Sequence, residues 1–218
     1  MRSPCLLHGL RVLCVATEGA SFRVLDTFRR LGAETIAIST RSIPVGSVGK
    51  PTIDDHVALT VDRLTRLGGD LLARIVRTAD VLFEQIAVDR ARESELELDA
   101  FQRVNPGLVI VTFAESPPGG NDARCIQRSS HDADTAVLAV ETALAALWHR
   151  DRRNGEGVRL KADIVSGLDQ GARSGDRTEV DAERRRADSL SILRAVDYSD
   201  KEIEALVGAR VLALGEGD

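Results

Sequence analysis

Apolar positions along the chain alternate between the two-residue spacing of strands and the three- to four-residue spacing of helices. Short apolar runs bounded by turn residues predict strands over 10–16, 35–38, 57–61, 79–83, 108–113 and 158–164. Apolar residues at helical spacing predict helices over 22–31, 64–77, 95–104 and 135–149. This order predicts an α/β fold with an open, mostly parallel, Rossmann-like sheet and helices on both faces.

The helix that begins near Asp132 is polarised along its length. Asp132 and Asp134 lie at its start, where free N–H groups favour negative charge, and basic residues lie at its end. We expect its buried face to carry Val137, Val140, Leu144, Leu147 and Trp148. We expect Gly155 and Gly157 to end it, because glycine tolerates the positive φ of a C-terminal cap.

The composition changes after residue 165. We therefore expect a Rossmann-like domain over 1–165, a linker over 166–178 rich in Gly, Ser and charge, and a helical segment over 179–218. In the last segment a charged helix is expected over 179–195. A second helix is expected over 201–207, capped by Ser199 or Asp200.

Charge and cysteine content narrow the classes of partner. The net charge of −5 argues against nucleic acid or an anionic membrane as the main partner, and no apolar run is long enough to span a bilayer. The three cysteines show no C-x-x-C spacing, so we expect a reducing, cytoplasmic location and no metal site. The first ten residues lead directly into a strand and do not resemble a signal peptide.

Sites in open parallel sheets lie beyond the carboxyl ends of the strands. In this chain that rule places residues 18–21, 40–44, 84–87 and 114–122 on the expected functional rim.

Six short motifs, in order along the chain, resemble the family III CoA-transferases, the group of formyl-CoA transferase, carnitine CoA-transferase and the α-methylacyl-CoA racemases. The opening strand matches L-x-G-x-R-V-L through Gly9, Arg11, Val12 and Leu13. The other matching stretches are Leu31-Gly32-Ala33-Glu34, Thr78 to Glu84, Asn105-Pro106-Gly107-Leu108-Val109, Ala146-Leu147-Arg150 with Gly155 and Gly157, and Asp197 to Leu206. The resemblance implies a divergent, shortened member of this group.

The departures from the family pattern fall in the ligand-binding segments. The loop E-N-x-R-P-G, which helps to hold CoA in the family, is replaced here by residues 84–89 and lacks the Arg-Pro-Gly. The glycine loop is reduced to Ser116-Pro117-Pro118-Gly119-Gly120, and the segment that carries the family's catalytic aspartate is shortened to 121–130.

The resemblance implies transfer of CoA between carboxylic acids through an aspartyl intermediate, with CoA or acyl-CoA as substrate. Asp122 is the candidate nucleophile, and the backbone N–H groups of Gly119 and Gly120 are candidate oxyanion donors. A solvated Asn121-Asp122 turn is the alternative. His131-Asp132 superficially resembles the racemases' His-Asp pair, but helix capping is the expected role of Asp132 and Asp134.

Arginines are the candidate ligands for the phosphates of CoA. Arg41 follows the second strand, where the family places residues that face the adenine and phosphates, and Arg63 and Arg66 are further cations. An exposed, solvated charge is the alternative for each of them, and Arg184 to Arg186 are expected to form a solvated helix face.

Three functions therefore compete. The chain is an acyl-CoA-processing enzyme, a non-catalytic binding or partner subunit with the same fold, or an α/β protein whose resemblance is purely structural. We expect a homodimer or a heteromer with a longer homologue, because the apolar faces of the 135–149 helix and of the sheet exceed what the chain can cover.

Overall fold

The computed structural model describes residues 5–15, 20–40, 57–86, 91–116, 132–165 and 182–214. Its elements in chain order are β1 (Arg11–Val15), α1 (Ala20–Arg30), β2 (Glu34–Thr40), β3 (Val57–Val61), α2 (Arg66–Arg77), β4 (Val81–Ile86), α3 (Ala91–Val104), β5 (Val109–Ser116), α4 (Asp132–Arg152), β6 (Arg159–Val165), α5 (Ala182–Ala195), α6 (Asp200–Gly208) and β7 (Leu212–Ala213). None of the helices within these residues is long and apolar enough to cross a membrane.

The strands form one sheet in the order β6-β5-β4-β1-β2-β3-β7. Neighbours from β6 to β3 are parallel, and β7 pairs antiparallel with β3. The open, mostly parallel α/β sheet expected from the sequence is confirmed, and the terminal strand β7 is an addition that the sequence pattern did not predict. A two-residue strand is too short to show periodicity.

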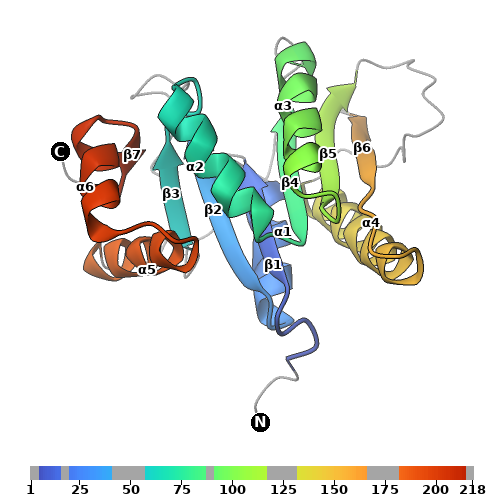
Figure 1. Cartoon of the computed structure of the whole chain (residues 1–218). Helices are drawn as coiled ribbons and strands as arrows, with labels where there is room; N and C mark the ends of the chain where they lie inside the picture. Colours follow the sequence, from blue (N-terminus) through green and yellow to red (C-terminus); the bar gives the residue numbers. More distant parts are fainter. Residues whose placement is uncertain are drawn as a thin grey trace.

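Helices cover both faces of the sheet (Figure 1). Helices α1 and α4 pack on one face, whereas α2, α3, α5 and α6 pack on the other. Alternate residues of each strand supply the two cores, so Leu13 faces the second group and Cys14 the first. Both cores are largely aliphatic, and the aromatic pair Phe28–Phe83, with ring centroids 5.7 Å apart, joins α1 to β4.

The buried face of α4 differs from the expected one. It is built mainly from alanines together with Val140 and Leu147, whereas Val137 and Trp148 are 56% and 61% exposed. Small side chains let α4 approach α1 and the sheet closely, so the alanine stripe, rather than the larger residues, faces the core. The prediction that Val137 and Trp148 are buried is wrong because apolar residues surround most of this helix.

The C-terminal segment packs on the same sheet as the preceding residues. Ile192 and Leu193 of α5 and Leu206 of α6 belong to the core beneath α2 and α3. The backbone N–H of Asp62 donates to the carbonyl oxygen of Val211 at 2.8 Å, immediately before β7. The end of the chain therefore supports the turn that follows β3. The expected linker, 166–178, lies outside the described residues.

Candidate functional site

The residues to which the family resemblance assigns chemistry lie outside the described residues. This applies to Asp122, Gly119, Gly120 and Arg41, and to His131. Of the expected functional rim, the structure describes Ser21 and Glu84 with their side chains. The candidate site is therefore built from what the structure places at the carboxyl ends of β3 and β4.

A three-residue ionic cluster occupies this edge of the sheet. Nη1 of Arg63 lies 3.2 Å from Oε1 of Glu84 and 3.4 Å from Oε2 of Glu97. Glu84 comes from β4, Glu97 from α3, and Arg63 from the connection between β3 and α2. The cluster joins two consecutive elements, β4 and α3, to the more distant β3–α2 connection, at the edge where open parallel sheets carry their sites.

Glu84 is the most buried member of the cluster. Its side chain is 3% exposed, and its Oε2 atom has no hydrogen-bond partner within the described part of the chain. Burial raises its pKa to about 7, an effect that Arg63 opposes and the neighbouring Glu97 reinforces. Burial also raises the pKa of Glu97. Glu84 therefore exchanges a proton with solvent in the physiological pH range.

Because the pKa of Glu84 is raised, we expect the free energy of unfolding to depend on pH. The folded state binds the proton of Glu84 more tightly than the unfolded state, whose glutamate titrates near the ordinary value of 4.5. The contribution of Glu84 to the free energy of unfolding should therefore be largest below about pH 4.5. It should fall by roughly 3 kcal/mol as the pH rises to about 7.

Urea unfolding across this pH range measures the effect. We expect Glu84→Gln to remove most of the decline, and the same change at the exposed Glu141 to leave it in place. An unchanged profile in Glu84→Gln would show that another group causes the pH dependence.

Arg63 is held by a tightly bonded turn. The side chain of Asp62 accepts from the backbone N–H of Leu64 at 3.2 Å, and Oγ1 of Thr65 donates to the carbonyl oxygen of Asp62 at 2.8 Å. Oγ1 of Thr65 also accepts from the backbone N–H of Gly68 and so caps α2. The expectation that Arg63 is a solvated charge is wrong, because its side chain is 12% exposed and paired.

Sequence reasoning placed Glu84 on the rim but did not connect it with Arg63 or Glu97. Glu97 lies within a helix whose acidic pattern is typical of a solvated surface, and no local signal marks it. Arg66, the other candidate cation, is exposed at the start of α2. Arg184 to Arg186 begin α5, and their side chains lie outside what the structure describes.

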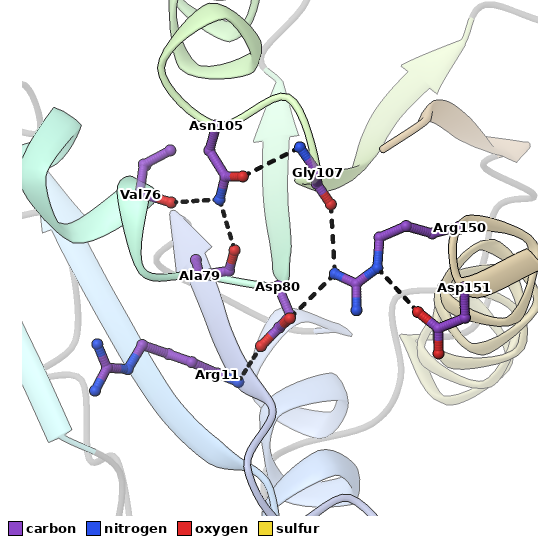
Figure 2. Close-up of polar contacts among 8 residues, drawn as sticks. All are labelled: Arg11, Val76, Ala79, Asp80, Asn105, Gly107, Arg150 and Asp151. Atoms are coloured by element: carbon purple, nitrogen blue, oxygen red, sulfur yellow. Dashed lines mark hydrogen bonds and ion pairs between the residues drawn. The ribbon is translucent and has the colours of Figure 1, made fainter. Parts of the chain in front are cut away.

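A second polar network lies at the opposite edge of the sheet, where the strands begin (Figure 2). Nη1 of Arg150, from α4, donates to Oδ1 of Asp80 at 3.0 Å and to the carbonyl oxygen of Gly107 at 3.3 Å. Oδ2 of Asp80 accepts from the backbone N–H of Arg11 at 2.9 Å. One carboxylate thereby fixes the starts of β1 and β4 and the end of α4.

Asn105 extends this network to α2. Its Nδ2 donates to the carbonyl oxygens of Val76 at 2.9 Å and Ala79 at 2.8 Å, and its Oδ1 accepts from the backbone N–H of Gly107. The side chain thus links the turn after α2 to the turn before β5 through three backbone groups.

Gly155 and Gly157 have different roles in the turn after α4. Gly155 has a φ of +80° and follows Asn154, which has a φ of +55°, and the N–H of Gly155 donates to the carbonyl oxygen of Arg150 at 3.1 Å, so both residues form the C-terminal cap. Gly157 instead allows close approach, because a Cβ there would overlap the backbone carbonyl of Leu108. The expectation that both glycines supply positive φ is therefore correct for Gly155 only, and Gly157 allows the turn after α4 to pack against the start of β5.

The motif near the C-terminus is also structural. Ser199 caps α6 and forms a capping box with Glu202, which decides between the two expected caps. Tyr198 is buried beneath the guanidinium of Arg74, which lies 4.3 Å from the ring centroid. Asp197 has a φ of +65°, a conformation that favours glycine.

The residues that carry the sequence resemblance therefore hold the fold together. Arg11, Asp80, Asn105, Arg150 and Gly157 lie at the amino edge, away from the edge that carries Glu84. The side chains of Asp80, Asn105 and Arg150 bond backbone groups, and Gly157 lets two backbone segments approach closely, so these residues report on the fold and not on the reaction. Within the described residues, no group of three or more His, Cys, Asp or Glu side chains is placed to hold a metal ion.

The fold of this chain is similar to that of known proteins. The sequence matches no protein-family profile and no curated protein. Among solved structures, it is similar to a CaiB/BaiF family protein from Brucella suis, with a TM-score of 0.56 and 21% identity over 73% of this chain and 53% of that one. It is also similar to Rv3272 from Mycobacterium tuberculosis, with a TM-score of 0.54 and 20% identity over 73% of this chain and 54% of that one.

These likenesses agree with the sequence resemblance at the level of the fold. CaiB/BaiF proteins are the family III CoA-transferases, so the chain has a CoA-transferase-like fold. It spans about half the length of the solved structures that it matches.

Proposed function

We propose that this chain is a divergent CoA-transferase-type protein that binds a CoA thioester at the carboxyl edge of its sheet. The observation that supports this most directly is that the fold similarity and the sequence resemblance point to the same family. The fold is similar to a CaiB/BaiF protein, and the motifs that resemble the same family form the amino-edge network of that fold. We also propose a cytoplasmic location, where CoA thioesters are made and used.

In the proposed reaction, the carboxylate of Asp122 attacks the thioester carbonyl and the carbon–sulfur bond breaks, which releases CoA thiolate and leaves an acyl-aspartyl anhydride. The thiolate then attacks the aspartyl carbonyl, and the original carboxylate departs. An acceptor carboxylate then attacks the enzyme thioester, which forms an aspartyl–acceptor anhydride and releases CoA thiolate. The thiolate attacks the acceptor-derived carbonyl, which gives the new CoA thioester and regenerates the carboxylate of Asp122. Gly119 and Gly120 are proposed to donate N–H groups to the oxyanion, and Arg41 to bind a phosphate of CoA.

A second candidate is a binding or partner subunit without catalysis. The replacement of Arg-Pro-Gly in the 84–89 segment favours it, because that loop helps to hold CoA in the family. In both cases we propose assembly as a homodimer or with a longer homologue, since Val137 and Trp148 expose apolar surface along α4. Light scattering at micromolar concentration should then give at least twice the monomer mass, and a monomer would contradict this.

Calorimetric titration with CoA and acetyl-CoA, with ATP as the control, tests ligand binding. We expect micromolar affinity and selectivity for CoA over ATP. The absence of binding would contradict the proposal that the chain binds a CoA thioester and would favour a structural or partner role. If CoA binds, acyl transfer should be measured with Asp122→Asn and with a matched change at the exposed Asp70 on α2. Turnover retained in Asp122→Asn would exclude Asp122 as the nucleophile.

A further inference from the structure

The carboxyl-edge cluster contains one more negative than positive group. Glu84 and Glu97 both contact Nη1 of Arg63, so the ionised cluster carries a net charge of −1 in a largely buried position. The Oε2 atom of Glu84 is buried and accepts no hydrogen bond from any residue in the described ranges. Burying an unsatisfied charged oxygen costs free energy, so a protonated Glu84 is the favourable state wherever the proton is available.

Arg63 retains unused donor capacity. The contacts described above involve Nη1, and no contact of Nη2 or Nε is seen with the residues that the structure describes. A guanidinium presents its N–H groups as a planar fork that matches the two oxygens of an oxyanion. Arg63 and Glu97, at 12% and 26% exposure, are the members through which the cluster reaches solvent.

The location of Arg63 at a helix start and the hydrogen bonds that fix its turn favour anion binding there. The residue lies in the turn that enters α2, where the helix dipole is positive. The turn is fixed by Asp62 and Thr65, and by the bond from the Asp62 N–H to Val211. A guanidinium on a rigid turn loses little further freedom when it binds.

We propose that Arg63 binds a small oxyanion, a carboxylate or a phosphate-type group, and that Glu84 takes up one proton from solvent as it does so. The incoming anion meets a cluster that is already negative, and protonation of Glu84 makes the cluster neutral. The inference concerns Arg63 and its two partners and stands whether or not CoA binds.

Among the residues that the structure describes, the titratable and charged groups that act on Glu84 come from several elements. Cys14 of β1 is one of them, and burial raises the pKa of its thiol to about 12, so the thiol stays neutral. Arg63 faces Glu84 from the β3–α2 turn, Glu97 from α3 and Arg159 from β6, and Arg159 is itself paired with Asp99 at 3.1 Å. The uncharged neighbours on the sheet are Val15 of β1 and Thr112 of β5, which lie beside Glu84 in register.

Calorimetric titration with sodium acetate and, separately, sodium sulfate tests the proposal, because both anions stay ionised at about pH 6 and about pH 8. The protonated fraction of Glu84 falls from about nine-tenths to about one-tenth across this range, so affinity should fall about tenfold. Titrations near pH 8 in two buffers of different ionisation enthalpy should show uptake of nearly one proton. Tighter binding of acetate identifies a carboxylate site, and tighter binding of sulfate identifies a phosphate-type site.

Three variants separate this proposal from non-specific binding. Glu84→Gln should bind equally well at both pH values, and Arg63→Gln should lose binding. Arg66→Gln, which removes an exposed arginine of the same helix start, should behave as the unmodified chain. The proposal is overturned if neither anion binds, if no proton is taken up, or if Glu84→Gln keeps the pH dependence. The proton measurement uses the unmodified chain, so it decides the question even if a variant does not fold.

Discussion

Gly68→Ala should destabilise this protein by about 3 kcal/mol or more, although alanine is the better helix former. Gly68 lies in the first turn of α2, and a Cβ there would overlap the backbone carbonyl oxygen of Asp62. The obstructing atom is main chain and belongs to the turn that carries Arg63, so the clash is relieved only by moving α2 or that turn.

The adjacent glycine provides a matched control. A Cβ at Gly69 meets no atom within 4 Å, so Gly69→Ala should stabilise the protein by about 0.5–1 kcal/mol through helix propensity alone. Urea unfolding monitored by circular dichroism measures both changes. Equal effects of the two substitutions would show that α2 does not approach Asp62 as closely as described.

Gly68→Ala also bears on the carboxyl-edge cluster. If the turn shifts, Arg63 moves relative to Glu84, and the decline of stability between about pH 4.5 and pH 7 should change in shape. Gly69→Ala should leave that profile unaltered. The pair thus tests whether backbone packing at α2 positions the ionic cluster.

Arg150→Met should cost about 2 kcal/mol or more. The substitution keeps most of the side-chain volume but removes the donor shared by Asp80 and the carbonyl oxygen of Gly107. Arg150 is 15% exposed and Asp80 26% exposed, so the remaining carboxylate is left only partly hydrated.

A double-mutant cycle isolates the interaction. Asp80→Asn should be destabilising alone, and its combination with Arg150→Met should cost less than the sum of the two. Arg152→Met is the control, since Arg152 is exposed on the same helix and lies over the ring of the exposed Trp148. Additive effects at Asp80 and Arg150 would show that the pair is not coupled. Ligand binding at the opposite edge should persist in any of these variants that folds.

The sequence predicted the classes of element and their order because the signals involved are local. Hydrophobic periodicity and caps depend on neighbours within a few residues, so six of the strands in the described sheet and a cap at Ser199 or Asp200 could be predicted, and the structure selects Ser199. The two-residue strand β7 could not, because it exists only by pairing with β3. The family resemblance could be read from the sequence as well, since its short motifs recur in order.

Tertiary structure decided which side chains meet and which surfaces are covered. The pattern of α4 offers apolar residues on several faces, and only packing against α1 and the sheet selected the alanine stripe over Val137 and Trp148. Likewise, Arg63, Glu84 and Glu97 lie on three different elements and become neighbours only when the β3–α2 turn, β4 and α3 assemble. Burial, which sets the protonation of Glu84, is a property of that assembly and of no local segment.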